Sequence, residues 1–199
     1  MKKLILICAI ASSIGCDNMS FQMDTDTKYA NESNSQITET CESPSNIGEG
    51  KRLVTALGCN NCHSPKKMTE FGPVPDKNIL LSGHPQSMPL ADYDPSAANS
   101  GAWILFSASG TAAVGPWGTS FASNLTPHET GIGNWSLEQF TKAMKEGKSK
   151  GLENGRMLLP PMPWVGYASL TDDELENIFD YLQSLEPIDN LVPAPIPPQ

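Results

Sequence analysis

The sequence has 199 residues and a formal net charge of −9 at pH 7, from 13 Lys and Arg against 22 Asp and Glu. Nucleic acids and anionic lipid surfaces attract basic proteins, so this balance argues against both as partners. The negative charge either keeps the protein soluble or steers it toward a basic patch on a partner, and the sequence leaves both open. With only 5 Cys and 3 His, thiol and imidazole chemistry is confined to few positions.

The first 15 residues have the pattern of a secretory signal. Lys2 and Lys3 precede an apolar run over 4–11, and small residues over 12–15 lead to Cys16. The run is shorter than the roughly 20 residues that a membrane-spanning helix needs. A small residue directly before a cysteine resembles the lipobox of bacterial lipoproteins. We therefore expect a lipoprotein-type signal peptide over 1–15, lipidation of Cys16, and a membrane-anchored protein in the bacterial periplasm; ordinary signal cleavage nearby is the alternative.

Residues 16–45 are polar and contain few large apolar side chains. Such a segment cannot bury enough surface to become ordered, so we expect a flexible tether. A random coil of this length has an end-to-end distance of roughly 30 Å, which lets a domain swing above a membrane. Cys41 lies in this tether and is interpreted as an incidental thiol, although an intermolecular disulfide is also open.

Residues 46–186 have the usual size of one domain. Its first predicted element is a helix over 47–57, because small or apolar residues recur there at spacings of three and four: Ile47, Gly50, Val54 and Leu57.

The pattern C-x-x-C-H follows this helix as Cys59, Cys62 and His63. It is typical of c-type haem attachment, in which two thiols add to the vinyl groups of the haem and the adjacent histidine reaches the iron. A redox-active dithiol needs a βαβ context and a structural zinc site needs four N or S ligands, and the sequence supplies neither. We predict one covalent haem c, with His63 as an axial ligand.

Residues 64–133 are rich in Gly, Pro, Ser and Asn, with short apolar pieces over 79–81 and 103–106 that are candidate strands. A connection this long is usually functional or wraps a ligand.

Two further helices are marked by capping boxes. One begins at Ser136 and runs out near Gly147, and the other begins at Thr171 and stops before Pro187. Their predicted buried faces comprise Leu137, Phe140 and Met144 in the first, and Leu175, Ile178, Phe179, Leu182 and Leu185 in the second. Residues 187–199 form a Pro-rich extended tail, interpreted as packing or spacing.

A haem iron also needs a sixth ligand or an open site. The candidates are Met68, Met88, Met144, Met157, Met162, His84 and His128. Met144 lies on the apolar face of a helix, which favours a core position. Met162 stands between Pro161 and Pro163, which fix the backbone around it.

This order of elements resembles class I cytochrome c. More narrowly, residues 123–136, 160–164 and 170–175 are similar to the single-haem modules in cytochrome subunits of membrane-bound alcohol, aldehyde and related dehydrogenases. The resemblance covers nearly all of residues 47–185. It implies a mainly α, class I cytochrome c fold with a long Gly/Pro-rich loop insertion between the haem-attachment helix and the later helices.

The same resemblance implies Met162 as the second axial ligand, with Met157 as runner-up. The family usually carries an acidic residue where this chain has His128, so histidine ligation through His128 or His84 stays an alternative to exposed loop histidines.

Five further residues are candidates for the haem environment. The side chains of Asn124 and Trp135 either donate to a propionate or serve as turn and core residues. The Pro73 carbonyl is the candidate that orients the axial histidine. Trp164 and Tyr167 are expected to pack beside the haem or to close the methionine loop.

A haem iron with two protein ligands has no vacant position, so it carries electrons rather than binding substrate. We therefore expect a lipid-anchored electron carrier and not an enzyme, relaying electrons from a dehydrogenase to an oxidase or another cytochrome. It could be the cytochrome subunit of such a complex. The alternative is a haem enzyme or a gas or redox sensor with an open or displaceable sixth ligand.

Overall fold

The structure is a computed structural model that describes residues 46–198. The predicted signal peptide, Cys16 and the predicted tether with Cys41 lie outside the described residues. The helices are α1 (Ile47–Ala56), α2 (Cys59–His63), α3 (Pro95–Asn99), α4 (Leu137–Glu146), α5 (Trp164–Tyr167) and α6 (Asp172–Gln183), with a 3-10 turn η1 (Ser149–Gly151). The strands are β1 (Lys66–Thr69), β2 (Gly72–Pro75), β3 (Leu105–Phe106), β4 (Ala112–Gly115) and β5 (Gly118–Phe121). Over residues 46–198, no helix is both long and apolar enough to cross a membrane.

The two capping boxes predicted from sequence are confirmed. Ser136 and Gln139 cap α4 reciprocally, and Thr171 and Glu174 do the same for α6. Each pair satisfies backbone N–H groups that the first helical turn leaves without a partner. Gly147 ends α4 at φ +67°, a left-handed conformation that glycine adopts without a side-chain penalty.

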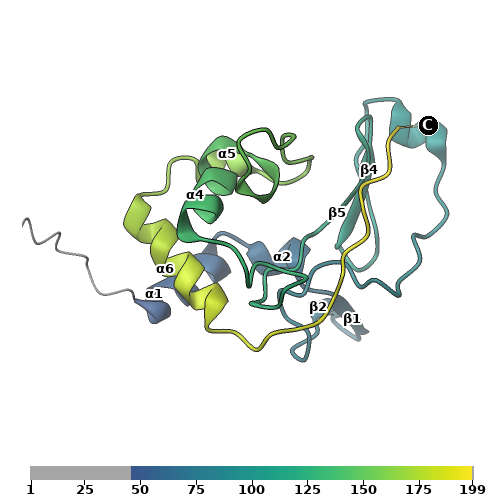
Figure 1. The fold of residues 1–199 in the computed structure, drawn as a ribbon. Coiled ribbons are helices and arrows are strands. Elements are labelled where there is room, and N and C mark those ends of the chain that lie inside the picture. The colour runs from purple at the N-terminus through teal and green to yellow at the C-terminus, as the bar shows by residue number, and fades with distance from the viewer. Residues whose placement is uncertain (1–45, 199) are drawn as a thin grey trace, which may run out of the picture. The chain divides into compact units, whose positions relative to one another are not determined.

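The main hydrophobic core lies where the N-terminal and C-terminal helices cross. α1 packs against α6, and α4 packs against both α5 and α6 (Figure 1). Gly50 makes the α1–α6 crossing close, because a Cβ atom there would lie 1.9 Å from the backbone oxygen of Asn177. The buried residues of this core cluster are Leu53, Val54, Leu81, Ile132, Phe140, Met144, Leu175, Ile178, Phe179 and Leu182.

The long segment between α2 and α4 carries two small antiparallel sheets rather than irregular loop alone. β1 and β2 form a hairpin, and β3, β4 and β5 form a three-stranded sheet in that order. Of the two candidate strands, only the end of 103–106 is a strand. Residues 79–81 instead form a turn. There Leu81, at φ +60°, places a buried side chain in the core and shares its backbone hydrogen bonds with Ser64 and Leu125.

The C-terminal tail runs back along β5 (Figure 1). Thr119 and Ile196 exchange two backbone hydrogen bonds, of 2.8 and 3.0 Å. Nearer the end of α6, the side-chain amide of Asn190 donates to the backbone oxygens of Ser82 and His84, at 2.7 and 2.9 Å. The tail therefore fastens the segment after the C-x-x-C-H pattern to the C-terminal part of the chain.

Candidate haem-binding site

The C-x-x-C-H pattern forms the short helix α2. Gly58, at φ +75°, turns the chain between α1 and α2, so the thiols of Cys59 and Cys62 lie on one helical turn. Both cysteines are free and half-buried. Burial raises the pKa of Cys59 to about 11, and the neighbouring Cys62 adds to this effect. In the absence of a bound group, this shift favours the protonated form of Cys59 at neutral pH.

His63 is buried, and within residues 46–198 its imidazole ring forms one hydrogen bond, to a backbone oxygen. Its Nδ1 lies 2.8 Å from the carbonyl oxygen of Ser123. A carbonyl oxygen only accepts hydrogen bonds, so Nδ1 donates and Nε2 of the neutral ring keeps its lone pair. Burial also lowers the pKa of His63, which favours this neutral form. A ring whose Nδ1 is fixed by a carbonyl and whose Nε2 forms no hydrogen bond within residues 46–198 has the arrangement of an axial ligand.

The structure gives the orienting position to Ser123 rather than to Pro73. Pro73 is exposed on β2, where it is paired with Met68 across the hairpin. Nothing in the sequence marks Ser123 as the residue that orients His63, because every residue has a backbone carbonyl. Ser123 does begin the 123–136 segment on which the resemblance rested.

Gly83 packs between the backbone of Ser123 and that of His63. Its N–H donates to the carbonyl oxygen of His63 at 2.8 Å, and a Cβ atom there would lie 2.6 Å from the carbonyl carbon of Ser123. The glycine has φ +80° and sits where no side chain fits. Residues before and after the inserted sheets are thus held together around the histidine.

Asn124 is a structural residue in this arrangement. Its side-chain oxygen accepts from the N–H and the hydroxyl of Thr126, and its amide donates to the oxygen of Ile188 at 2.8 Å. The side chain is 2% exposed, so it has no free donor to offer a propionate. Trp135 is half-buried against the core, and its indole N–H forms no hydrogen bond within residues 46–198.

Met162 packs against the same hydrophobic cluster as Cys59. Its loop is fastened to the sheet, because the Ser120 hydroxyl donates to the Pro160 oxygen at 2.6 Å. Met157 is 43% exposed and pairs with Lys148 across a β-bridge. Met162 is therefore the more buried of these two methionines.

The two aromatic residues after Met162 connect its loop to the helices. The Tyr167 hydroxyl donates to the Leu57 oxygen at 3.1 Å, two residues before Cys59. Burial raises the pKa of Tyr167, and the nearby Cys59 and Cys62 add to the effect. The ring of Trp164 lies against Gly147, where a Cβ atom would approach it to 2.5 Å.

The other two histidines already have partners. His84 is 1% exposed, so it is not an exposed loop histidine. Its Nδ1 lies 2.9 Å from the Thr111 hydroxyl, and its ring is 4.8 Å from that of Phe121. His128 has its Nδ1 2.9 Å from the Thr130 hydroxyl, within its own loop. Both arrangements are those of structural histidines.

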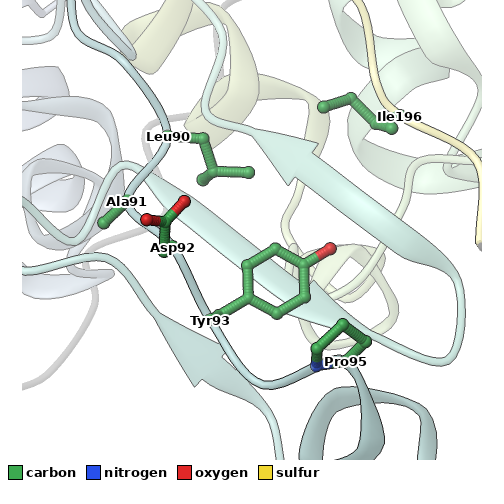
Figure 2. A pocket seen from close by; sticks show the side chains of 6 residues that line it. All are labelled: Leu90, Ala91, Asp92, Tyr93, Pro95 and Ile196. Carbon is green, nitrogen blue, oxygen red and sulfur yellow. The ribbon is translucent and has the colours of Figure 1, made fainter.

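In the part of the chain that the structure describes, no three His, Cys, Asp or Glu side chains are placed to hold a metal ion together. The two free thiols and the fixed imidazole are the groups that a covalently attached haem requires. A separate pocket of about 240 Å³ lies between the inserted segment and the tail, lined by Leu90, Ala91, Asp92, Tyr93, Pro95 and Ile196 (Figure 2). None of its lining residues belongs to the C-x-x-C-H pattern or the methionine loop.

Comparison with known proteins supports this interpretation. No family model matches the sequence. It is 38% identical over 92 residues to the fructose dehydrogenase cytochrome subunit of Gluconobacter japonicus, covering 45% of this chain and 18% of that protein. It is 37% identical over 75 residues to the cytochrome c subunit of the quinone-dependent alcohol dehydrogenase of Gluconobacter oxydans, covering 37% of this chain and 15% of that protein. The gluconate 2-dehydrogenase cytochrome c subunit of Pantoea cypripedii is 39% identical over 67 residues, covering 33% and 14%.

The matched stretches span less than a fifth of each of these relatives. Such relatives suggest a cytochrome c fold and support a role in electron transfer. The resemblance inferred from the motifs is confirmed: this chain is similar to the cytochrome subunits of dehydrogenases.

Proposed function

We propose that this chain is a monohaem c-type cytochrome that carries single electrons and catalyses no reaction of its own. The observation that carries the proposal is the geometry of His63, whose Nδ1 is fixed 2.8 Å from the Ser123 oxygen beside two free thiols. The relatives support it, because several are named cytochrome subunits of dehydrogenases.

Each residue of the site has one task in this proposal. Cys59 and Cys62 hold the haem by thioether bonds, and His63 ligates the iron through Nε2. Ser123 keeps the imidazole in the required tautomer and orientation. Met162 would hold the iron from its anchored loop. The haem, when bound, supplies an iron that changes its oxidation state by one electron.

A closed coordination sphere is what makes the site a carrier. A haem held by both His63 and Met162 would leave no position free for substrate and would exchange one electron with little rearrangement. The anchoring of the methionine loop to β5, through Ser120 and Pro160, opposes displacement of the ligand.

The N-terminal pattern and the relatives support a proposal for location and partners. In our proposal Cys16 carries a lipid that holds the protein at a membrane in the bacterial periplasm. The segment up to residue 45 tethers the cytochrome domain, residues 46–186. The electron donor is a dehydrogenase, and the acceptor is an oxidase or another cytochrome. No nucleic acid is involved.

Optical spectra of the purified haem protein test the proposal. Wild type should retain haem through denaturation, and a Cys59→Ala, Cys62→Ala double variant should lose it. The weak far-red band of methionine-bound ferric haem should vanish in Met162→Ala and survive in Met157→Ala. Survival of the band in Met162→Ala would refute the ligand assignment. Rapid binding of carbon monoxide by reduced wild type would instead indicate an open or displaceable ligand, as in a haem enzyme or sensor.

A further inference from the structure

Lys66, the first residue of β1, turns its side chain back toward the haem-attachment helix. Its Nζ donates to the Asn61 oxygen at 2.5 Å and to the Ser109 oxygen at 2.8 Å. The next residue, Lys67, is exposed and forms an ion pair with Asp76 at 2.8 Å. Two adjacent lysines on one strand therefore have different environments.

The Lys66 ammonium lies directly beside the haem-attachment residues. The Asn61 oxygen belongs to the peptide group that joins Asn61 to Cys62, so the ammonium contacts the backbone of an attaching cysteine. Among residues 46–198, no carboxylate lies within ion-pair distance of Lys66. Its charge is therefore held in place by two carbonyl dipoles and is not neutralised locally.

The inserted segment holds the ammonium in this position. Ser109 and Gly110 form a turn before β4, and Gly110 has φ +70°. A Cβ atom at Gly110 would lie 2.4 Å from Nζ of Lys66, so a glycine leaves the room that the ammonium occupies. The turn at Ser109 and Gly110 thus closes over a charge beside Cys62.

We propose that Lys66 tunes the reduction potential of the haem by fixing a positive charge beside Cys62; this rests on the haem function proposed above. A ferric haem gains one electron to become ferrous and so loses one positive charge. A nearby cation disfavours the ferric state by Coulomb repulsion and thereby raises the potential. Lys66 acts through this field as a positioning residue, without touching the iron.

Redox titration of the full-length haem protein tests this proposal with three variants. In Lys66→Met the ratio of reduced to oxidised haem at a fixed applied potential should fall at least about threefold. This equals about 28 mV for one electron, at 59 mV per tenfold change. Lys66→Arg keeps the charge and should retain most of the wild-type ratio. Lys67→Met removes an adjacent, ion-paired charge and should leave the ratio unchanged.

A purely structural role for Lys66 gives a different result. If the lysine only clamps Ser109 to α2, Lys66→Met lowers the unfolding midpoint but leaves the potential unchanged, and the proposal is wrong. An equal shift in Lys67→Met would also overturn it, because the effect would then belong to surface charge in general.

A second variant covers the case in which Lys66→Met does not fold. Gly110→Ala crowds Nζ while keeping every charge, so it should lower the ratio in the same direction by a smaller factor; an unchanged ratio contradicts the proposal. Haem content separates this test from that of the function. Wild type without covalent haem refutes the proposed function, whereas normal haem with no shift refutes only the role of Lys66.

Discussion

His63 donates from Nδ1 to the carbonyl oxygen of Ser123, a residue 60 positions later in the chain, at 2.8 Å. This contact joins the two ends of the segment that carries both small sheets, because His63 ends α2 and Ser123 follows β5. It leaves Nε2 as the free nitrogen of the ring. Both small sheets thus lie, in the chain, between the two residues whose hydrogen bond orients His63, the proposed iron ligand.

Gly83→Ala should weaken the contact between His63 and Ser123. The new Cβ atom would lie 2.5 Å from the Ala122 oxygen and 2.6 Å from the Ser123 carbon, both backbone atoms that cannot move freely. We expect a loss of about 1 to 3 kcal/mol in the free energy of unfolding from the clash, beyond the strain of a positive φ. Urea denaturation measures this loss, and haem retention reports on the histidine.

Gly101→Ala is the matched control for Gly83. Gly101 has φ +72°, close to the +80° of Gly83, but no atom lies within 4 Å of its Cβ position. It should therefore show only the backbone strain, about 1 to 2 kcal/mol. Equal losses at the two positions would mean that contact with the Ser123 backbone has no energetic weight.

Gly50→Ala should separate α1 from α6. Its Cβ atom would lie 1.9 Å from the Asn177 oxygen and 2.8 Å from Cβ of Tyr181, so the two helices would have to move apart. We expect a loss of stability of about 2 to 4 kcal/mol. Thermal unfolding followed by circular dichroism measures it.

Gly48→Ala is the comparison on the same helix. Its closest neighbour is Oδ1 of Asn46, at 3.2 Å, which caps α1 by accepting from the Glu49 N–H. A small shift of this side chain relieves the contact, so the substitution should change stability by no more than about 1 kcal/mol. Similar destabilisation at both glycines would argue against a close α1–α6 crossing.

Tyr167→Phe should loosen the methionine loop. The substitution removes the 3.1 Å hydrogen bond to the Leu57 oxygen and costs about 0.5 to 1.5 kcal/mol. Because the bond connects α5 to the residue before Gly58, the far-red band of the haem protein should also weaken at a lower temperature than in wild type. Tyr93→Phe, on the inserted segment at the separate pocket, is the control; a band as heat-resistant as wild type in Tyr167→Phe would contradict this prediction.

Stability should fall as the pH drops below about 6.5, because of His84. Burial lowers the pKa of His84 in the folded protein, so the unfolded chain, with an ordinary pKa near 6.5, binds a proton first. The stability due to neutral His84 is therefore complete above about pH 6.5. It declines toward the lowered folded pKa, with a slope of up to about 1.4 kcal/mol per pH unit.

Urea denaturation of the haem protein between pH 5.5 and 7.5 checks this sign. His84→Gln should be less stable at pH 7.5, since it disturbs the contact with Thr111, and should show a shallower decline on acidification. A decline of equal steepness in His84→Gln would assign the effect to other groups.

Local sequence patterns were sufficient for the helices near the core. Ser136 and Thr171 mark helix starts through contacts three residues away, so their capping boxes could be read directly. The two small sheets could not be predicted in this way. β2 consists of Gly72, Pro73, Val74 and Pro75, which are typical of loops, and it is a strand only because it pairs with β1.

The sequence by itself determined the C-x-x-C-H pattern, the helices around it and the proline-framed Met162, because each depends on neighbours a few positions apart. Only the tertiary structure decided which carbonyl orients His63, which methionine lies against the core with Cys59, and where the Lys66 ammonium is held. These depend on backbone atoms of residues 40 to 110 positions away, brought near by burial and by glycines that allow close approach. A carbonyl oxygen is common to every residue, so no spacing in the sequence marks the one that the fold uses.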